Sequence, residues 1–163
     1  MGLERIISGG QTGVDRGALD AALRLGVPCG GWCPRGRKSE NGPIPARYPL
    51  VSLDSDDYPA RTRANVEEAD GTLILASGPL RGGTALTRRL ARRSGRACLV
   101  VDPSQEEAVD EVREWLCDHA ITVLNVAGPR ESQQPGIERI AEAFLAELLS
   151  VGRDDGNDEI DRR

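Results

Sequence analysis

The sequence predicts an α/β fold of the Rossmann-like, doubly wound type, with a mostly parallel sheet flanked by helices on both faces. Two observations predict it. Short aliphatic runs alternate with segments of helical periodicity along the whole chain. Hydrophobic residues make up 39% of the chain but aromatic residues only 3%, which is typical of a buried parallel sheet built from Val, Ile and Leu.

The elements follow one another in a regular order. The predicted strands are residues 5–8, 30–33, 50–53, 71–76, 97–101 and 121–126. Apolar positions at helical spacing predict helices at residues 14–25, 60–69, 84–94, 105–118 and 136–149. Gly26 and Gly95 stand where glycines commonly end a helix. The stretch 34–49, rich in Pro and Gly, is predicted to be an ordered functional loop.

Length and composition limit the organisation and the class of partner. We expect one ligand-binding domain over residues 1–150 and a polar, weakly ordered tail over 151–163. The net charge of −5 argues against nucleic-acid binding. No apolar run is long enough to span a membrane and no signal peptide is apparent, so we predict a cytoplasmic protein with reduced cysteines. The four cysteines do not form a zinc-binding pattern, and no structural metal is expected.

Three strand ends carry the chemistry. Residues 9–13 (GGQTG), 77–84 (SGPLRGGT) and 125–132 (NVAGPRES) each follow a predicted strand. Because the carboxyl ends of parallel strands share one edge of a sheet, the three turns should meet there. The first turn lacks the Lys-Ser/Thr of a P-loop and does not fit GxGxxG. Free N–H groups at helix starts would instead make an anion-binding crevice.

The turns, with cations near them, supply the candidate binding residues. They are Gly9, Gly10, Gln11, Thr12, Gly13, Arg16, Arg35, Lys38, Gly82, Gly83, Thr84, Arg130, Glu131 and Ser132. Two alternatives stay open: the first turn could be a tight turn capped by Thr12, and the loop cations, Arg37 among them, could form a solvated surface.

No catalytic residue is assigned from the sequence. The carboxylates expected near the crevice are Asp15, Glu40, Asp70 and Glu131. Asp15 also falls in the first turn of a helix, where a carboxylate stabilises the helix by itself. His119 and the two tryptophans are interpreted as structural, although Trp32 adjoins the loop and could line a site.

The same blocks resemble the family of molybdenum carrier (molybdenum cofactor carrier) proteins. The resemblance runs from about residue 4 to 150 and rests on residues 8–20, 30–37, 42–45, 61–66, 70–74, 82–87 and 125–132. It implies a Rossmann-like fold in the wider superfamily of LOG-type nucleotide hydrolases. It also implies molybdenum cofactor as a bound cargo and assembly into a homo-oligomer, a dimer or a tetramer.

One departure separates the possible functions. LOG-type hydrolases carry Gly-Gly-x-Gly-Thr-x-x-Glu, and here Thr87 stands in the position of the Glu. A Thr hydroxyl does not act as a base near neutral pH. The sequence therefore favours a non-catalytic carrier of molybdenum cofactor or a related phosphorylated pterin or nucleotide. The alternatives are a nucleotide N-glycosidase or phosphoribohydrolase, with Glu40 or Glu131 substituting, and a nucleotide-ligand sensor.

Overall fold

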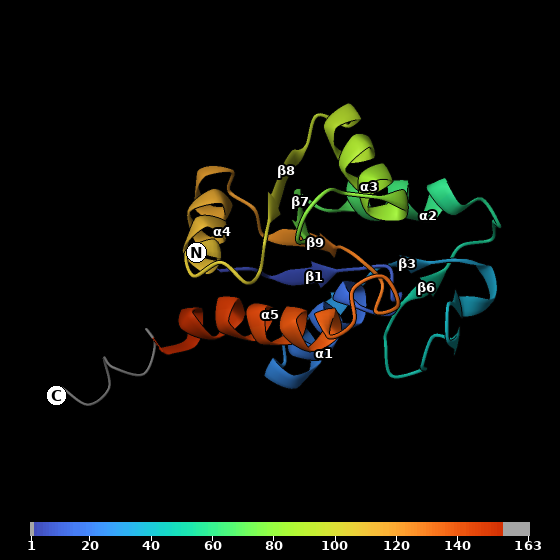
Figure 1. Ribbon diagram of the computed structural model, residues 1–163, viewed down its shortest axis with the longest axis horizontal. Coiled ribbons are helices and arrows are strands. Elements are labelled where there is room, and N and C mark those ends of the chain that lie inside the picture. Colours follow the sequence, from blue (N-terminus) through green and yellow to red (C-terminus); the bar gives the residue numbers. More distant parts are fainter. Residues whose placement is uncertain (1, 155–163) are drawn as a thin grey trace, which may run out of the picture.

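Five short parallel strands form the central sheet of the computed structural model, which describes residues 2–154 (Figure 1). Across the sheet the order is β2 (Cys29–Gly30), β1 (Arg5–Ile7), β9 (Val123–Ala127), β7 (Gly71–Leu75) and β8 (Ala97–Val101). Every neighbouring pair in this sheet is parallel. The α/β fold class predicted from the sequence is confirmed.

Helices cover both faces of the sheet. One apolar core joins the sheet to α1 (Val14–Leu25), α4 (Ala108–Asp118) and α5 (Ile137–Asp154). The other face carries α2 (Tyr58–Glu68) and α3 (Gly82–Arg93), which pack against each other (Figure 1). Gly17 lets α1 approach α5 closely, because a Cβ there would lie 2.4 Å from the Glu138 carbonyl oxygen. Parallel strands and this layering place the ends of β1, β7 and β9 at one edge.

The predicted strand 30–33 is two strands rather than one. β2 belongs to the main sheet, whereas β3 (Trp32–Cys33) leaves it and pairs in parallel with β6 (Val51–Ser52). The break falls at Gly31, whose φ is +136°. A Cβ on Gly31 would lie 2.1 Å from the Ser8 carbonyl oxygen. Close approach to the end of β1 therefore turns the chain out of the sheet at this glycine.

The long loop is held by one arginine. It contains a 3-10 turn, η1 (Arg35–Arg37), and a small hairpin of β4 (Lys38–Ser39) and β5 (Gly42–Pro43). The guanidinium of Arg37 donates hydrogen bonds of 2.8–3.2 Å to four carbonyl oxygens, those of Ile44, Pro45, Tyr48 and Leu50. Arg37 is consequently occupied by the loop itself and is not a clamp for a ligand.

Other element ends shift by a few residues from the sequence prediction. Helix α4 begins at Ala108 rather than at residue 105, and α2 begins at Tyr58 with Pro59 in its first turn. Gly26 has the left-handed conformation expected of a residue that ends α1. The last helix runs to Asp154, so the predicted tail begins within it, and residues 155–163 lie outside the described part of the chain. Among the described residues, none of the helices has the length and apolar character needed to cross a membrane.

Candidate functional site

A cavity of about 380 Å³ lies at the carboxyl edge of the sheet. The first turns of α2 and α3 form one side of it, and the turn that follows β9 forms the other. Its polar and charged lining combines two arginines with one carboxylate. The lining residues are Gln11, Asp15, Tyr58, Arg61, Thr62, Gly82, Gly83, Thr84, Thr87, Ala127, Gly128, Arg130 and Gln133.

The first turn of α3 opens into this cavity. Within residues 2–154, the N–H groups of Gly82 and Gly83 find no hydrogen-bond acceptor, and no side chain caps the helix. The Thr84 N–H donates to the Arg81 carbonyl oxygen at 3.1 Å. Gly83 packs against the Tyr58 side chain, and a Cβ there would lie 2.5 Å from the Tyr58 hydroxyl, which would have to move. Unpaired N–H groups and the helix dipole make this turn attractive to an anion.

Arg61 lies beside this helix start and was not among the residues predicted for the site. It is only 9% exposed. Its Nε is buried and has no hydrogen-bond acceptor within the described residues, and its Nη1 is 3.7 Å from Asp15 Oδ2. The guanidinium also lies over the Tyr58 ring, at 5.1 Å from the centroid. Because a buried donor without a partner is costly, an external acceptor would be favourable here.

The burial pattern of α2 draws attention to Arg61. The buried residues of α2 are Arg61, Thr62, Asn65 and Val66, so most of the face that the helix turns inward is polar. An interior polar face is unusual unless its groups are paired or serve a ligand. Asn65 is paired with the backbone of Trp32 in both directions, at 2.8 and 3.0 Å. Trp32 itself donates to Glu68 at 2.7 Å and does not line the cavity.

Asp15 is the carboxylate that the fold brings to the cavity. It is 6% exposed and its Oδ2 accepts the Gln11 N–H at 3.1 Å. Burial raises the pKa of this carboxyl, while the Arg61 guanidinium opposes the rise. Asp15 thus has the structural role expected of a carboxylate in the first turn of a helix, and it also lines the cavity.

The first glycine turn is closed by protein groups. Consecutive N–H groups of Gln11, Thr12, Gly13 and Val14 donate to Asp15, the Gln11 side chain, Glu138 and the Pro129 carbonyl, at 3.1–3.3 Å. Gly13 packs against the third turn, where a Cβ would lie 2.2 Å from the Pro129 carbonyl oxygen. The four N–H groups from Gln11 to Val14 therefore all have protein acceptors, contrary to the expectation from the sequence.

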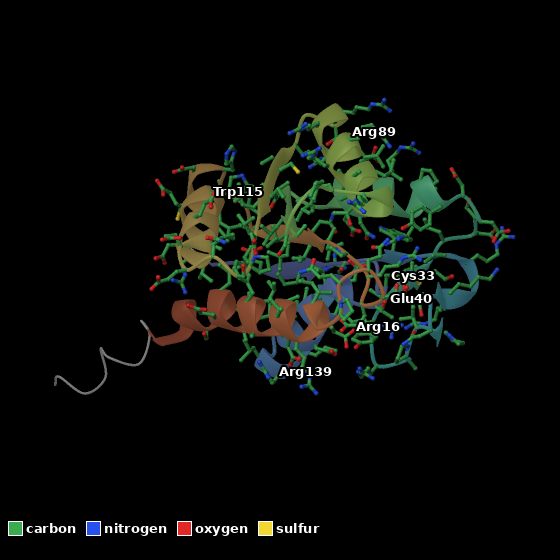
Figure 2. The ribbon with its side chains drawn as sticks, in the orientation of Figure 1. Arg16, Cys33, Glu40, Arg89, Trp115 and Arg139 are labelled. Carbon is green, nitrogen blue, oxygen red and sulfur yellow. The ribbon has the colours of Figure 1, made fainter. Side chains whose placement is uncertain are left out.

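The exposed carboxylate of Glu40, from the loop 34–49, bonds the Thr12 hydroxyl of this turn and Ser132 of the turn after β9. It accepts hydrogen bonds from Thr12 Oγ1, Ser132 Oγ and the Ser132 N–H, and its own N–H donates to Gln11 Oε1 at 3.0 Å. Bonds from Ser132 and Thr12 lower the pKa of the Glu40 carboxyl. Figure 2 shows Glu40 near the start of α1, which carries Arg16. Thr12 and Ser132, both predicted to bind a ligand, consequently bind Glu40 of the loop 34–49.

Three predicted cations do not reach the cavity. Arg16 is buried and donates to the Gly10 carbonyl at 3.1 Å and to Ser39 Oγ at 2.8 Å. Arg35 pairs with the exposed Asp54 at 2.9 Å and with Asp56 at 3.6 Å. Lys38 is exposed on the hairpin. Only Arg130 of the predicted cations lines the cavity, because the other three serve or lie on the loop 34–49.

Two predicted carboxylates are also placed elsewhere. Glu131 accepts the N–H groups of Gly136 and Glu138 and thereby caps the start of α5. Asp70 precedes β7, at the opposite edge of the sheet from the cavity, and accepts the N–H groups of Thr122 and Val123 at 3.0 and 2.9 Å. These bonds lower the pKa of Asp70. The expectation that Asp70 lies near the crevice is wrong. Asp70 stands at the start of β7, whereas the crevice lies where the strands end.

Of the predicted binding residues, the cavity contains Gln11, Gly82, Gly83, Thr84 and Arg130. Gly9 packs beneath it against the pair of Arg61 and Asp15, and a Cβ there would lie 3.1 Å from Asp15 Oδ2. Gly10 packs against Leu50.

Comparison with known proteins agrees with this architecture. Residues 6–149 match the model of the circularly permutated YpsA SLOG family. The chain belongs to this family. It is also similar to a solved structure, the "Putative molybdenum carrier protein" of Syntrophus aciditrophicus SB, with 43% identity and a TM-score of 0.86 over 90% of this chain and 94% of that one. No curated protein gave a significant match. The resemblance drawn from the sequence is confirmed.

Within this SLOG family member, Thr87 faces the same cavity as the α3 helix start. Its Oγ1 donates to the Gly83 carbonyl at 2.9 Å. At the position where LOG-type enzymes carry a Glu, the side chain is thus bonded back to its own helix. No group of three His, Cys, Asp or Glu side chains within residues 2–154 is arranged to hold a metal ion.

A second cavity of about 410 Å³ lies next to the first. The two share Thr84 and Gln133 in their linings. The second adds Leu80, Pro79 and Ala76 to a smaller set of polar residues. It therefore offers space for a less charged group beside the first cavity.

Proposed function

We propose that this protein is a non-catalytic carrier that binds a phosphorylated small molecule, with the phosphate held between Arg61 and the first turn of α3. The observation that carries the proposal is the buried guanidinium of Arg61, whose Nε has no acceptor among the described residues. Arg61 lines the cavity together with Gly82 and Gly83, whose N–H groups also have no acceptor there. Arg130 adds a second cation to the same space. A phosphate supplies several acceptor oxygens for these donors.

The cargo class that fits is molybdenum cofactor or a related phosphorylated pterin or nucleotide. Such ligands join a charged phosphate to a large ring system. The cavity at Arg61 suits the phosphate, and the neighbouring cavity of about 410 Å³ gives the ring system a place to lie. The similarity to a protein named as a molybdenum carrier supports this choice of cargo. The binding residues that we propose are Gln11, Arg61, Gly82, Gly83, Thr84 and Arg130.

The decisive experiment measures binding without turnover. Isothermal titration with a nucleoside monophosphate should give saturable binding to the wild-type chain. Arg61→Lys keeps the charge but removes the planar donor fork, so we expect affinity to fall at least about tenfold. The matched control is Arg89→Lys, on the outer side of α3 (Figure 2), which should stay within about twofold. Equal loss in both variants, or no binding to wild type, would refute the proposal.

Cargo identity needs a separate measurement. Protein purified from a host that makes molybdenum cofactor should carry a pterin that mass spectrometry detects, and Arg61→Lys should reduce its amount. A pterin-free protein that still binds nucleoside monophosphates would redirect the proposal from the cofactor to nucleotides.

One observation favours a second candidate, hydrolysis of an N-glycosidic bond. Asp15 is a buried carboxylate of raised pKa in the cavity, a setting in which general acids and bases are found. The Glu40 carboxylate bonds Ser132, and the Glu131 carboxylate caps α5. Asp15 therefore replaces both as the candidate acid or base. Release of free base from nucleoside monophosphates, abolished in Asp15→Asn, would establish this activity in place of the carrier role.

We also propose that the chain assembles as a homo-oligomer, a dimer or a tetramer, and acts in the cytoplasm. The outer face of α3, with Arg89, Arg92 and Arg93, is exposed and suits an acidic partner surface. Light scattering of the purified chain tests the assembly, and a monomer at all concentrations would exclude it.

A further inference from the structure

A single carboxylate lies among the cations of the cavity. Asp15 Oδ2 is 3.7 Å from Arg61 Nη1, and both residues line the main cavity and the small one of about 20 Å³ beneath it. An anion that pairs with Arg61 must therefore come close to Asp15. A site built to take any oxyanion would avoid a negative charge at this place, because like charges at short range repel.

The repulsion disappears when the anion carries a proton. A P–OH group can donate a hydrogen bond to the Asp15 carboxylate while its remaining oxygens accept from Arg61 and from the first turn of α3. Phosphate monoesters exchange a proton close to neutral pH, with a second pKa of about 6. Sulfate and molybdate are fully deprotonated at neutral pH and can only accept. They would set bare oxygen atoms against a bare carboxylate.

We propose that Asp15 is a specificity-determining residue that makes the cavity select oxyanions bearing a proton, so that phosphate and phosphate monoesters bind and sulfate and free molybdate are rejected. The inference rests on the proposed function and deepens it. It means that a molybdenum-containing cargo enters with its phosphate end at Arg61, and that the inorganic molybdate ion is not the ligand of this site.

The surroundings of Asp15 support a carboxylate that shares a proton. The charged groups that face it are Arg61 from α2 and Arg130 from the turn after β9, while the Gln11 N–H donates a hydrogen bond to its carboxylate. Burial nevertheless raises its pKa above the ordinary range. As the pH falls and Asp15 becomes protonated, it can donate to any oxyanion. Discrimination against sulfate should therefore weaken in acid. It should also weaken well above the second pKa of the phosphate, where the P–OH proton is lost.

The test compares three tetrahedral anions on the full chain. Titration calorimetry at neutral pH should show inorganic phosphate binding at least about tenfold more tightly than sulfate or molybdate, since an unpaired buried like charge costs more than the about 1.4 kcal/mol that a tenfold ratio represents. In Asp15→Asn the amide group can donate to every anion. The ratio should then fall towards one because sulfate and molybdate gain affinity.

Two controls keep the outcome clear. Asp20→Asn removes the same charge from the same helix, where Asp20 instead accepts from the Tyr48 hydroxyl at 2.8 Å, and should leave the ratio unchanged. If Asp15→Asn does not fold, the wild-type chain still answers the question, because its phosphate-to-sulfate ratio should decline as pH falls through the Asp15 titration.

The possible failures are distinct. Sulfate or molybdate binding as tightly as phosphate at neutral pH would overturn the selectivity and leave the carrier function standing. Selectivity that persists undiminished in Asp15→Asn would assign it to another residue. No binding of any of the three anions, together with none of a nucleoside monophosphate, would overturn the proposed function itself.

Discussion

Gly13→Ala tests the conclusion that the first glycine turn is a packing contact and not an anion loop. Gly13 has φ +84° and ψ −132°, a region that Ala adopts at a cost of roughly 1–3 kcal/mol. Its Cβ would lie 2.2 Å from the Pro129 carbonyl oxygen and 2.8 Å from the Glu131 nitrogen, both backbone atoms. Overpacking of this kind adds about 1–3 kcal/mol. The expected loss is therefore about 2–6 kcal/mol, a large part of a typical 5–15 kcal/mol.

The control is Gly78→Ala, which has a similar φ of +79° but nothing within 4 Å of its Cβ. Urea unfolding at neutral pH, followed by circular dichroism, gives both free energies. We expect Gly78→Ala to lose only about 1–2 kcal/mol, from backbone strain alone. If Gly13→Ala were as stable as Gly78→Ala while losing affinity for phosphate, the turn would be an anion loop after all. Failure of Gly13→Ala to fold beside a folded Gly78→Ala would agree with the packing argument.

The remaining predictions concern polar groups outside the cavity. Arg37→Lys should lose about 2–4 kcal/mol and make the loop 34–49 sensitive to proteases, because the four carbonyl bonds need the guanidinium fork, whereas Arg35→Lys should cost less than about 1 kcal/mol. Glu40→Gln should reduce the acid sensitivity of urea unfolding: the lowered pKa means that this carboxylate stabilises the fold above its ordinary pKa and ceases to do so as the pH falls through the folded value. An unchanged pH profile would show that the Glu40 bonds do not contribute. Asp70→Asn should destabilise by about 1 kcal/mol and leave nucleoside monophosphate binding unchanged, and an effect on binding would contradict its place at the opposite edge.

The sequence predicted the fold well because the decisive signal is local. The aliphatic run at 71–75 and the helical spacing after Val14 each follow from the neighbouring residues alone. The break at Gly31 was not predictable, since it depends on the Ser8 carbonyl oxygen, which lies far away in the sequence. Asp70 was misplaced for a related reason. Its role is fixed by Thr122 and Val123, more than fifty residues further along the chain.

The site was predicted less completely than the fold, and the cations show why. Arg35, Arg37 and Lys38 are concentrated in one loop, and their number suggested a clamp. In the structure Arg37 holds the loop and Arg35 pairs with acidic neighbours outside the cavity. Arg61 lies outside that loop, on α2, yet it is the arginine of the cavity lining whose buried Nε has no acceptor within residues 2–154. Charge density in a sequence does not reveal which donors the fold leaves unsatisfied.

The two glycine-rich helix starts, at α1 and α3, also differ in which of their backbone donors the fold leaves unpaired. Both offer N–H groups at the carboxyl edge of the sheet, and the sequence gives no means of ranking them. At α1 the donors from Gln11 to Val14 all have protein acceptors. At α3 those of Gly82 and Gly83 have none among the described residues, and Arg61 lies beside them with its own donor unpaired. A ligand bound at α1 would have to displace existing hydrogen bonds, whereas one bound at α3 adds new ones. The free energy therefore favours the second turn, although the first turn has the more recognisable sequence.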